Sequence, residues 1–215
     1  MLHSHSGSIQ QYMEQLDDPG RDRPEHCPQC RIQEPMRAHG FYRRTIVDEA
    51  FDGVIRVRRY LCEACRRTVS LLPEFVLPYL RFAIVVIAAF LRARLWSGQT
   101  LKAAAETAHQ TGMPYQRGQQ WVSRFRRQAE SLSAALAVLV RPIVAADFVH
   151  KAIQMLEEAG WVRAHRFLFE QLRQHLLGWP DCLAPAGIAV TVGKANRRSR
   201  RSPQSTCMDS ESPPA

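Results

Sequence analysis

The sequence predicts an α+β fold in which a small N-terminal β ribbon precedes an all-α bundle. Two observations lead to this class. Two Cys-x-x-Cys hooks, Cys27–Cys30 and Cys62–Cys65, enclose a stretch rich in β-branched and aromatic residues. From Tyr79 onwards, apolar residues recur at steps of three and four, which is the spacing of helices that bury one face.

The two hooks predict one metal site formed by Cys27, Cys30, Cys62 and Cys65. A gap of two residues lets both thiolates of a hook turn toward one point, and a hairpin between the hooks brings them together. Four thiolates at this spacing are typical of structural zinc, so we predict one Zn²⁺ per chain. Rubredoxin-type iron sites use nearly the same spacing, so iron stays an alternative. Disulfides or redox-active pairs fit less well, because nothing indicates secretion and a thioredoxin-like site needs a single hook.

The residues between the hooks predict the strands of a zinc ribbon over residues 25–75. Phe41–Val47 and Val54–Leu61 read as two strands, and Asp52-Gly53 between them is a turn signal. A third short strand is expected within Arg66–Leu72. The sequence therefore predicts a hairpin with one added strand.

Positive charge is concentrated after the ribbon. The chain carries 29 Lys and Arg against 20 Asp and Glu, a formal net charge of +9. Residues 21–75 hold eleven basic and eight acidic residues, whereas residues 79–141 hold nine basic and two acidic ones. We therefore expect the contact with a polyanion in the second segment. The rival anchor is a basic strand face formed by Arg43, Arg56 and Arg58, because Arg56 and Arg58 alternate with apolar residues.

The segment after the ribbon predicts three helices. They are Tyr79–Trp96, then Leu101 to about Gln110 with Thr100 as N-cap, then Tyr115–Val140. A short helix, a turn containing Gly112 and a longer helix with a basic start form the outline of a helix-turn-helix. The alternative is a three-helix bundle whose polar face contacts only solvent.

The polar start of the third helix supplies the candidate DNA contacts. Glutamine can pair with adenine, and arginine with guanine or phosphate. The base-edge candidates are Gln116, Gln119, Gln120 and Ser123, and the phosphate candidates are Arg117, Arg124, Arg126 and Arg127. Gly118 departs from the pattern, because such motifs usually place a buried aliphatic residue there.

Several sequence runs then point to a family. They are Cys-Pro-x-Cys, His39-Gly40-Phe41-Tyr42-Arg43-Arg44, Arg58-Arg59-Tyr60-Leu61-Cys62-Glu63-Ala64-Cys65-Arg66-Arg67-Thr68, and Leu71-Leu72-Pro73 before an Arg-flanked helix. Over about residues 25–130 the chain resembles the N-terminal region of bacterial insertion-sequence transposases, and most closely a transposase-like family of otherwise unassigned function. The resemblance implies a zinc ribbon plus helix-turn-helix that recognises element-end DNA.

One departure from that family bears on catalysis. Such transposases continue into an RNase H-like core in which three carboxylates hold two metal ions. Beyond Arg141 the acidic residues fall mostly on predicted helices, and there is no run of strands to build that core. We therefore expect no enzyme activity, and a zinc-dependent DNA-binding protein that is an accessory, regulatory or decayed relative of a transposase. A zinc-ribbon protein-interaction module is the first alternative, and a rubredoxin-like iron protein is the second.

The expected organisation follows from these elements. Residues 1–24 read as a flexible leader with a short helix, 25–75 as the ribbon and 79–141 as the DNA-binding helices. Residues 147–178 read as a C-terminal helical pair, and 179–215 as a disordered basic tail.

The expected partners and location follow from composition. Double-stranded DNA is the expected partner, and the apolar stripe of the C-terminal pair is a candidate homodimer interface. Cys182 and Cys207 read as plain thiols. Because Met1–Asp18 has no apolar core and Phe82–Leu91 is too short to span a bilayer, we expect a cytoplasmic protein without membrane contact.

Overall fold

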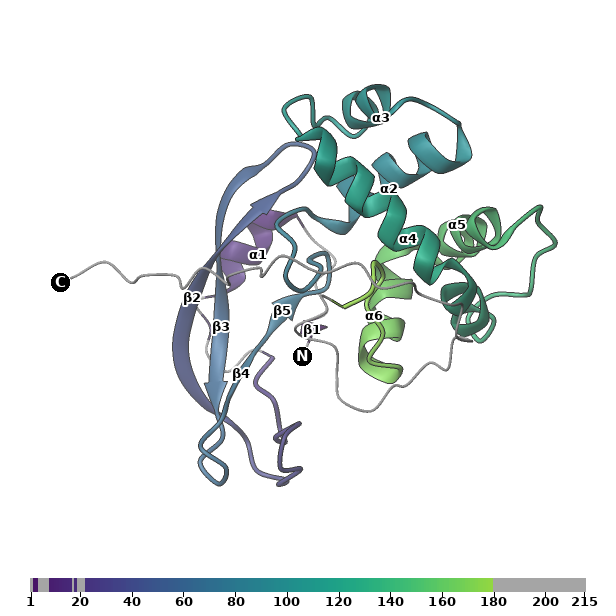
Figure 1. Ribbon diagram of the computed structural model, residues 1–215. Helices are drawn as coiled ribbons and strands as arrows, with labels where there is room; N and C mark the ends of the chain where they lie inside the picture. Colours follow the sequence, from purple (N-terminus) through teal and green to yellow (C-terminus); the bar gives the residue numbers. More distant parts are fainter. Residues whose placement is uncertain (1, 4–7, 17, 19–21, 180–215) are drawn as a thin grey trace, which may run out of the picture.

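The computed structural model describes residues 2–3, 8–16, 18 and 22–179 (Figure 1). Within these residues the fold is mixed α+β, with a small antiparallel sheet and six α-helices, as the sequence predicts. The strands are β1 (Leu2–His3), β2 (Arg37–Val47), β3 (Asp52–Leu61), β4 (Thr68–Ser70) and β5 (Leu72–Pro73). The helices are α1 (Ile9–Gln15), α2 (Ile84–Leu91), α3 (Leu101–Thr107), α4 (Tyr115–Leu136), α5 (Phe148–Ala159) and α6 (Trp161–Gln171). A π-helical turn, η1 (Arg92–Trp96), continues α2.

The predicted ribbon strands are present as an antiparallel sheet of order β2-β3-β4. The turn of the hairpin, however, is at Asp48–Phe51, where the Asp48 N–H donates to the Phe51 carbonyl at 2.6 Å. Asp52 and Gly53, predicted as the turn, instead open β3 opposite Val47 and Ile46. A Cβ on Gly53 would lie 2.8 Å from the Phe51 ring, so this glycine makes room for a side chain.

The N-terminal segment docks onto the ribbon where it is described, which differs from the flexible leader expected over residues 1–24. Helix α1 begins with a capping box between Ser8 and Gln11. It buries Ile9, Tyr12 and Leu16 in one cluster with residues of β2 and β3. The apolar residues recur on one side of the helix, so burying them holds α1 against the sheet.

The three helices predicted after the ribbon are present with shorter bounds. The first begins at Ile84 instead of Tyr79, because Phe82 and Ala83 form β-bridges with Val47 and Val76. The second begins after Thr100, whose hydroxyl accepts the Ala103 N–H at 3.2 Å. The third ends at Leu136 instead of Val140.

Close packing explains the glycine that departs from the helix-turn-helix pattern. Gly118 is buried on α4, and a Cβ there would lie 2.8 Å from the Phe90 ring and 3.5 Å from Leu101. The Phe90 ring also packs edge-on against Trp121, with centroids 5.3 Å apart. The ring of α2 thus fills the space that an aliphatic side chain on α4 would take.

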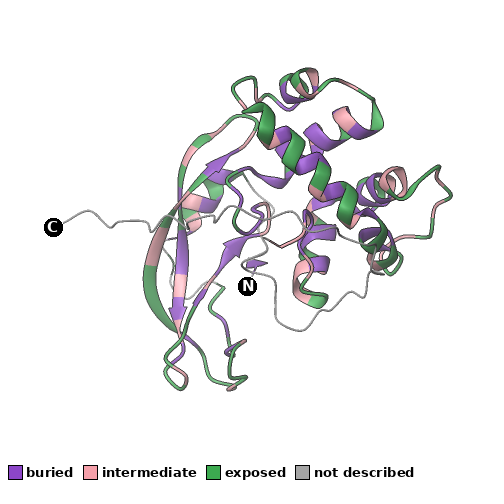
Figure 2. Ribbon diagram, in the orientation of Figure 1, coloured by how far each residue is buried: buried purple, intermediate pink, exposed green. Residues whose placement is uncertain are grey.

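The C-terminal helices belong to the same core as α2 and α4 (Figure 2). The predicted pair over residues 147–178 is shorter than expected, because α6 ends at Gln171, and residues 172–179 fold back with Leu176 and Leu177 buried. The apolar stripe of this pair is therefore used mainly within the chain, and Phe148 and Leu172 are its exposed members.

The predicted tail beyond Trp179, including Cys182 and Cys207, lies outside the described residues. Among the residues that are described, no helix has the length and apolar character needed to cross a membrane.

Candidate metal centre and candidate nucleic-acid interface

The fold brings the four predicted cysteines together at one end of the β2–β3 hairpin. Cys62 and Cys65 follow β3, and Cys27 and Cys30 precede β2. All four Sγ atoms lie within 4.8 Å of one another. The Sγ atoms of Cys27 and Cys65 are 3.8 Å apart, and those of Cys30 and Cys62 are 3.6 Å apart. Zn–S bonds of about 2.3 Å in a tetrahedron require sulfur pairs about 3.8 Å apart. The cluster therefore has the dimensions of a four-thiolate metal site.

The two hooks have the same backbone geometry. In each, the N–H after the second cysteine donates to the carbonyl of the first, at 2.8 and 2.9 Å. The N–H of the first cysteine donates to the carbonyl five residues on, at 3.1 and 2.9 Å. The residue after the second cysteine, Arg31 or Arg66, is left-handed in both hooks, with φ of 61° and 57°. This matched strain indicates that each hook is bent to aim two sulfurs at one point.

The electrostatics of the cluster favour a bound cation. The N–H of Cys30 lowers the pKa of the Cys27 thiol to about 7, and the N–H of Gln29, 3.4 Å from that sulfur, adds to the effect. The Ile32 N–H lowers the pKa of the Cys30 thiol, but burial and the neighbouring Cys62 sulfur outweigh it and raise that pKa to about 11. A divalent cation would supply the charge that lets all four thiols ionise together. The donor set fits Zn²⁺.

A second candidate site lies on the outer face of α4. Six of the eight predicted DNA contacts line one open hollow of about 640 Å³, together with Trp179. They are Gln116, Gln119, Gln120, Ser123, Arg124 and Arg127. At about 100° per residue, these positions share one side of the helix, opposite the buried Trp121, Phe125 and Leu132. We call this site the α4 hollow, and among the residues that the structure describes no acidic residue lines it.

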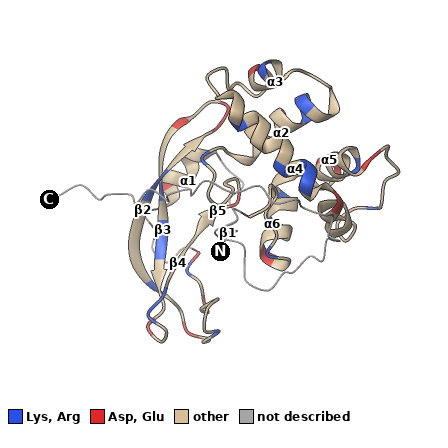
Figure 3. Cartoon of the chain, in the orientation of Figure 1, with Lys and Arg blue, Asp and Glu red and all other residues tan. Residues whose placement is uncertain are grey.

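The other two predicted contacts lie outside the α4 hollow. Arg117 is half-buried and Arg126 is exposed on the flank of the helix. Arg126 and Arg127 form no hydrogen bond or ion pair with any residue that the structure describes, so their charge is available to a ligand. Both signs of charge occur elsewhere, but Figure 3 shows Lys and Arg along β2, β3 and α4.

Arg124 has a structural task at the edge of the α4 hollow. Its Nε atom donates to the Leu177 carbonyl at 2.9 Å, and its Nη2 atom donates to the Gly178 carbonyl. His175 holds the same segment, because its Nε2 atom donates to the Pro78 carbonyl at 3.0 Å and its Nδ1 atom accepts the Leu177 N–H at 3.1 Å. Arg124 therefore fixes a wall of the hollow, in contrast to the phosphate contact predicted for it.

That wall ends in Trp179, a lining residue that the sequence reasoning did not single out. Its indole N–H donates to the Arg173 carbonyl at 2.7 Å. The rings of His175 and Phe169 lie 5.5 and 5.9 Å from it, and that of Tyr79 lies 6.2 Å away. The hydrogen bond to the Arg173 carbonyl thus holds the indole in one orientation beside α4. The available signal was an aromatic residue at the point where helical periodicity ends.

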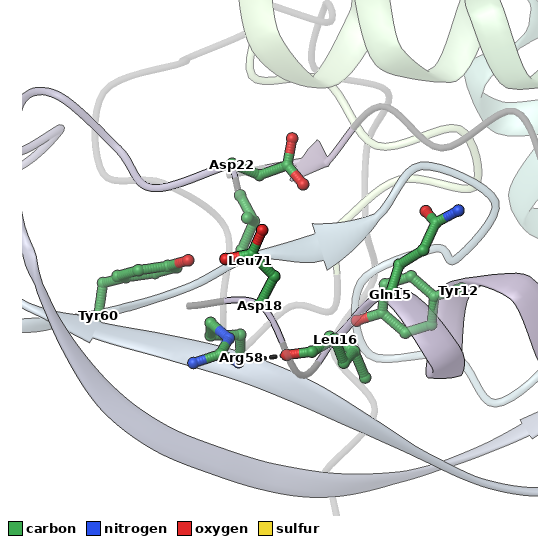
Figure 4. Close-up of a pocket in the computed structure, with 8 residues that line it drawn as sticks. All are labelled: Tyr12, Gln15, Leu16, Asp18, Asp22, Arg58, Tyr60 and Leu71. Carbon is green, nitrogen blue, oxygen red and sulfur yellow. Dashed lines mark hydrogen bonds between the residues drawn. The ribbon is translucent and has the colours of Figure 1, made fainter. Parts of the chain in front are cut away.

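The ribbon arginines form a smaller basic surface than predicted. Arg58 donates to the Leu16 carbonyl (Figure 4). It is 8% exposed, and its guanidinium lies 4.3 Å from the Phe41 ring centroid. Leu16, directly after α1, covers this part of β3, so Arg58 cannot belong to an open basic face. Arg43 and Arg56 remain exposed and are directly opposite each other across β2 and β3.

Comparison with known proteins gives one match. A protein-family model described as "Domain of unknown function (DUF6431)" matches residues 27–111. That range includes the four cysteines, the sheet, α2 and α3, and it ends before α4. No curated protein and no solved structure matches the chain.

Proposed function

We infer that this chain binds DNA through the α4 hollow and that a zinc ion held by Cys27, Cys30, Cys62 and Cys65 braces the adjoining ribbon. The observation that carries the proposal is the lining of the hollow. It gathers three glutamine amides, a serine hydroxyl and the Arg127 guanidinium on one helix face, and within the described part of the chain no acidic residue lines it. Amides and hydroxyls pair with base edges, whereas arginine neutralises phosphates.

The structural parts of a helix-turn-helix support the same proposal. Helix α3 is capped by Thr100, a turn over residues 108–114 follows, and α4 begins with its polar face exposed. Its apolar face is fixed against α2 through Phe90 and Trp121. A rigid scaffold thus presents a polar helix face, which is what positioning a nucleic acid requires.

The zinc ion would act structurally. All four ligands are thiolates and no open coordination position remains, which is the donor set of structural sites. The bound ion would close the ribbon by joining the segment before β2 to the end of β3. An accessory, regulatory or decayed role beside a transposase, without catalysis by this chain, remains part of the proposal and rests on the sequence resemblance.

A binding titration over a range of salt concentrations tests the DNA proposal. The probe is a partial duplex with a single-stranded overhang, so that either form of DNA can bind. Each neutralised phosphate should lower log affinity against log salt by ~0.7 to 0.9 per contact. Arg127→Ala should weaken binding and make that slope shallower by about one contact.

The matched control is Arg163→Ala, which removes an exposed arginine from α6. It should leave the affinity and the slope unchanged. Salt-independent binding, or equal effects of both variants, would contradict the assignment to the α4 hollow.

One observation supports the ribbon as a second candidate surface for DNA. Arg43 and Arg56 are exposed and lie directly opposite each other across the strands, so two positive charges meet at one place on the sheet. The Arg56 guanidinium also lies 4.1 Å from the Phe41 ring centroid, which fixes its position. This pair is the rival to α4.

A further inference from the structure

The α4 hollow is concave on one side, which restricts the form of DNA that fits it. A helix that reads duplex DNA enters a major groove ~12 Å wide. An α-helix with its side chains is already ~10–12 Å across. Residues 177–179 run beside α4, tied to Arg124 through two carbonyls. The groove has no room for a helix and a second segment of chain together.

The chemistry of the hollow suits a base that has left the stack. Trp179 offers an aromatic ring whose orientation is fixed by its hydrogen bond to the Arg173 carbonyl. Stacking on an aromatic ring accepts any base, and it is the usual means of holding single strands. Gln116 and Gln120 line the same hollow and carry amides that can pair with the exposed edges of an unstacked base. Arg127 lines the same hollow and can hold a phosphate.

We propose that the α4 hollow binds single-stranded DNA, with one unpaired base stacked on Trp179, its edge hydrogen-bonded by the glutamines and its phosphate held by Arg127. This assignment rests on the proposed DNA-binding function of the same face and names the form of DNA that it takes. Trp179 is thereby a binding residue, and Arg124 and His175 are positioning residues that hold it beside α4.

The test compares one 16-nucleotide single strand with a hairpin in which a non-nucleotide linker joins the same 16 nucleotides to their full complement, so that no base is unpaired. Binding is measured by anisotropy, and stacking by quenching of tryptophan fluorescence in a Trp96→Phe background. That background removes a half-exposed indole on η1 that lies outside the hollow. The single strand should bind at least about tenfold more tightly than the hairpin and should quench the fluorescence.

Three variants separate stacking from structure. Trp179→Ala should weaken single-strand binding about tenfold, which is the scale of one stacked base. Trp179→Phe keeps a ring, so it should retain most of the affinity while the quenching is lost. Tyr79→Ala removes a ring that contacts Trp179 but does not line the hollow, and it should have little effect.

Circular dichroism of each variant confirms that the helices remain folded. Equal affinity for strand and hairpin would overturn the single-strand assignment while leaving the DNA proposal intact. Equal losses in Trp179→Ala and Tyr79→Ala would also overturn it, by showing that the ring only supports the wall. Absence of salt-dependent binding to either probe would overturn the proposed function itself.

Discussion

The molecule has two halves, the ribbon with its cysteine hooks and the helices from α2 to α6, and different interactions stabilise the hooks and the helices. Among the described residues, the hydrophobic cluster around the cysteines has six buried members, and two of those are Cys27 and Cys62. The cluster that joins α2 to α6 has thirty-one. So few apolar side chains cannot offset the conformational entropy of the loops that carry the hooks, whereas the helical cluster is the size of an ordinary core. We therefore expect metal binding to keep the hooks folded and apolar packing to keep the helices folded.

Loss of the metal should give the largest difference between the halves, because it should unfold the hooks and leave the helices folded. Cys27→Ser or Cys65→Ser removes one of four ligands from a site that can contribute ~10–16 kcal/mol of apparent binding free energy. We expect the zinc and the folded hooks to be lost together, while most of the helical signal in circular dichroism remains.

Metal analysis of the purified variants checks this expectation. Serine at the isolated Cys207 is the matched control and should retain one zinc per chain. One zinc per chain in both hook variants would contradict the four-cysteine site. Collapse of the helical signal along with the metal would contradict the independence of the two halves.

A second prediction tests packing in the helical half. Gly118→Ala places a Cβ 2.8 Å from the Phe90 ring, and overpacking of this kind costs ~1–3 kcal/mol. Because alanine gains up to ~1 kcal/mol over glycine inside a helix, the free energy of unfolding from urea titration should fall by up to about 2 kcal/mol, with zinc content unchanged. Gly112→Ala is the control, because a Cβ there meets nothing within 4 Å. Equal stability of the two variants would show that Phe90 does not fill the space beside Gly118.

A third, more gradual effect is acid sensitivity of the helical half. Burial lowers the pKa of His165 to about 3 and that of His175 to about 4. Both rings are therefore neutral in the folded chain, while in the unfolded chain they take up protons near pH 6.5. The unfolded state binds more protons below that pH, so stability is full above about pH 6.5 and is lost as the pH falls toward 4.

Between the folded and unfolded pKa values, each histidine lowers the free energy of unfolding by about 1.4 kcal/mol for every unit by which the pH falls. His165 is fully buried and is neutral in the folded chain, so His165→Leu should flatten the slope by about one proton. Urea titrations at pH 7, 6 and 5, with zinc content measured at each, check this. The exposed His109→Asn is the control, and an unchanged slope in His165→Leu would be evidence against the assignment.

Much of the ribbon could be predicted because its signals are local. The two hooks, the β-branched runs and the third strand each depend on neighbours in sequence. The turn was misplaced because Gly53 serves the Phe51 ring, which only the folded hairpin reveals. The burial of Arg58 was missed for a similar reason, because the covering carbonyl belongs to Leu16, 42 residues away.

The α4 face was predictable, and its surroundings were not. Helical periodicity places Gln116, Gln120 and Ser123 on one side whatever the rest of the chain does. The wall of the hollow depends instead on Arg124 meeting carbonyls more than fifty residues later. Sequence spacing carries no signal for such a contact, so Trp179 was not recognised as a lining residue.

The most direct test of the account is the salt dependence of DNA binding in two double variants with equal charge loss. Arg126→Ala with Arg127→Ala removes two exposed charges from α4, and Arg43→Ala with Arg56→Ala removes two from the ribbon. We expect the α4 double variant to make the slope of log affinity against log salt shallower by roughly one to two units, and the ribbon double variant to leave it unchanged. A slope that flattens only in the ribbon pair would place the DNA on the sheet and contradict the account.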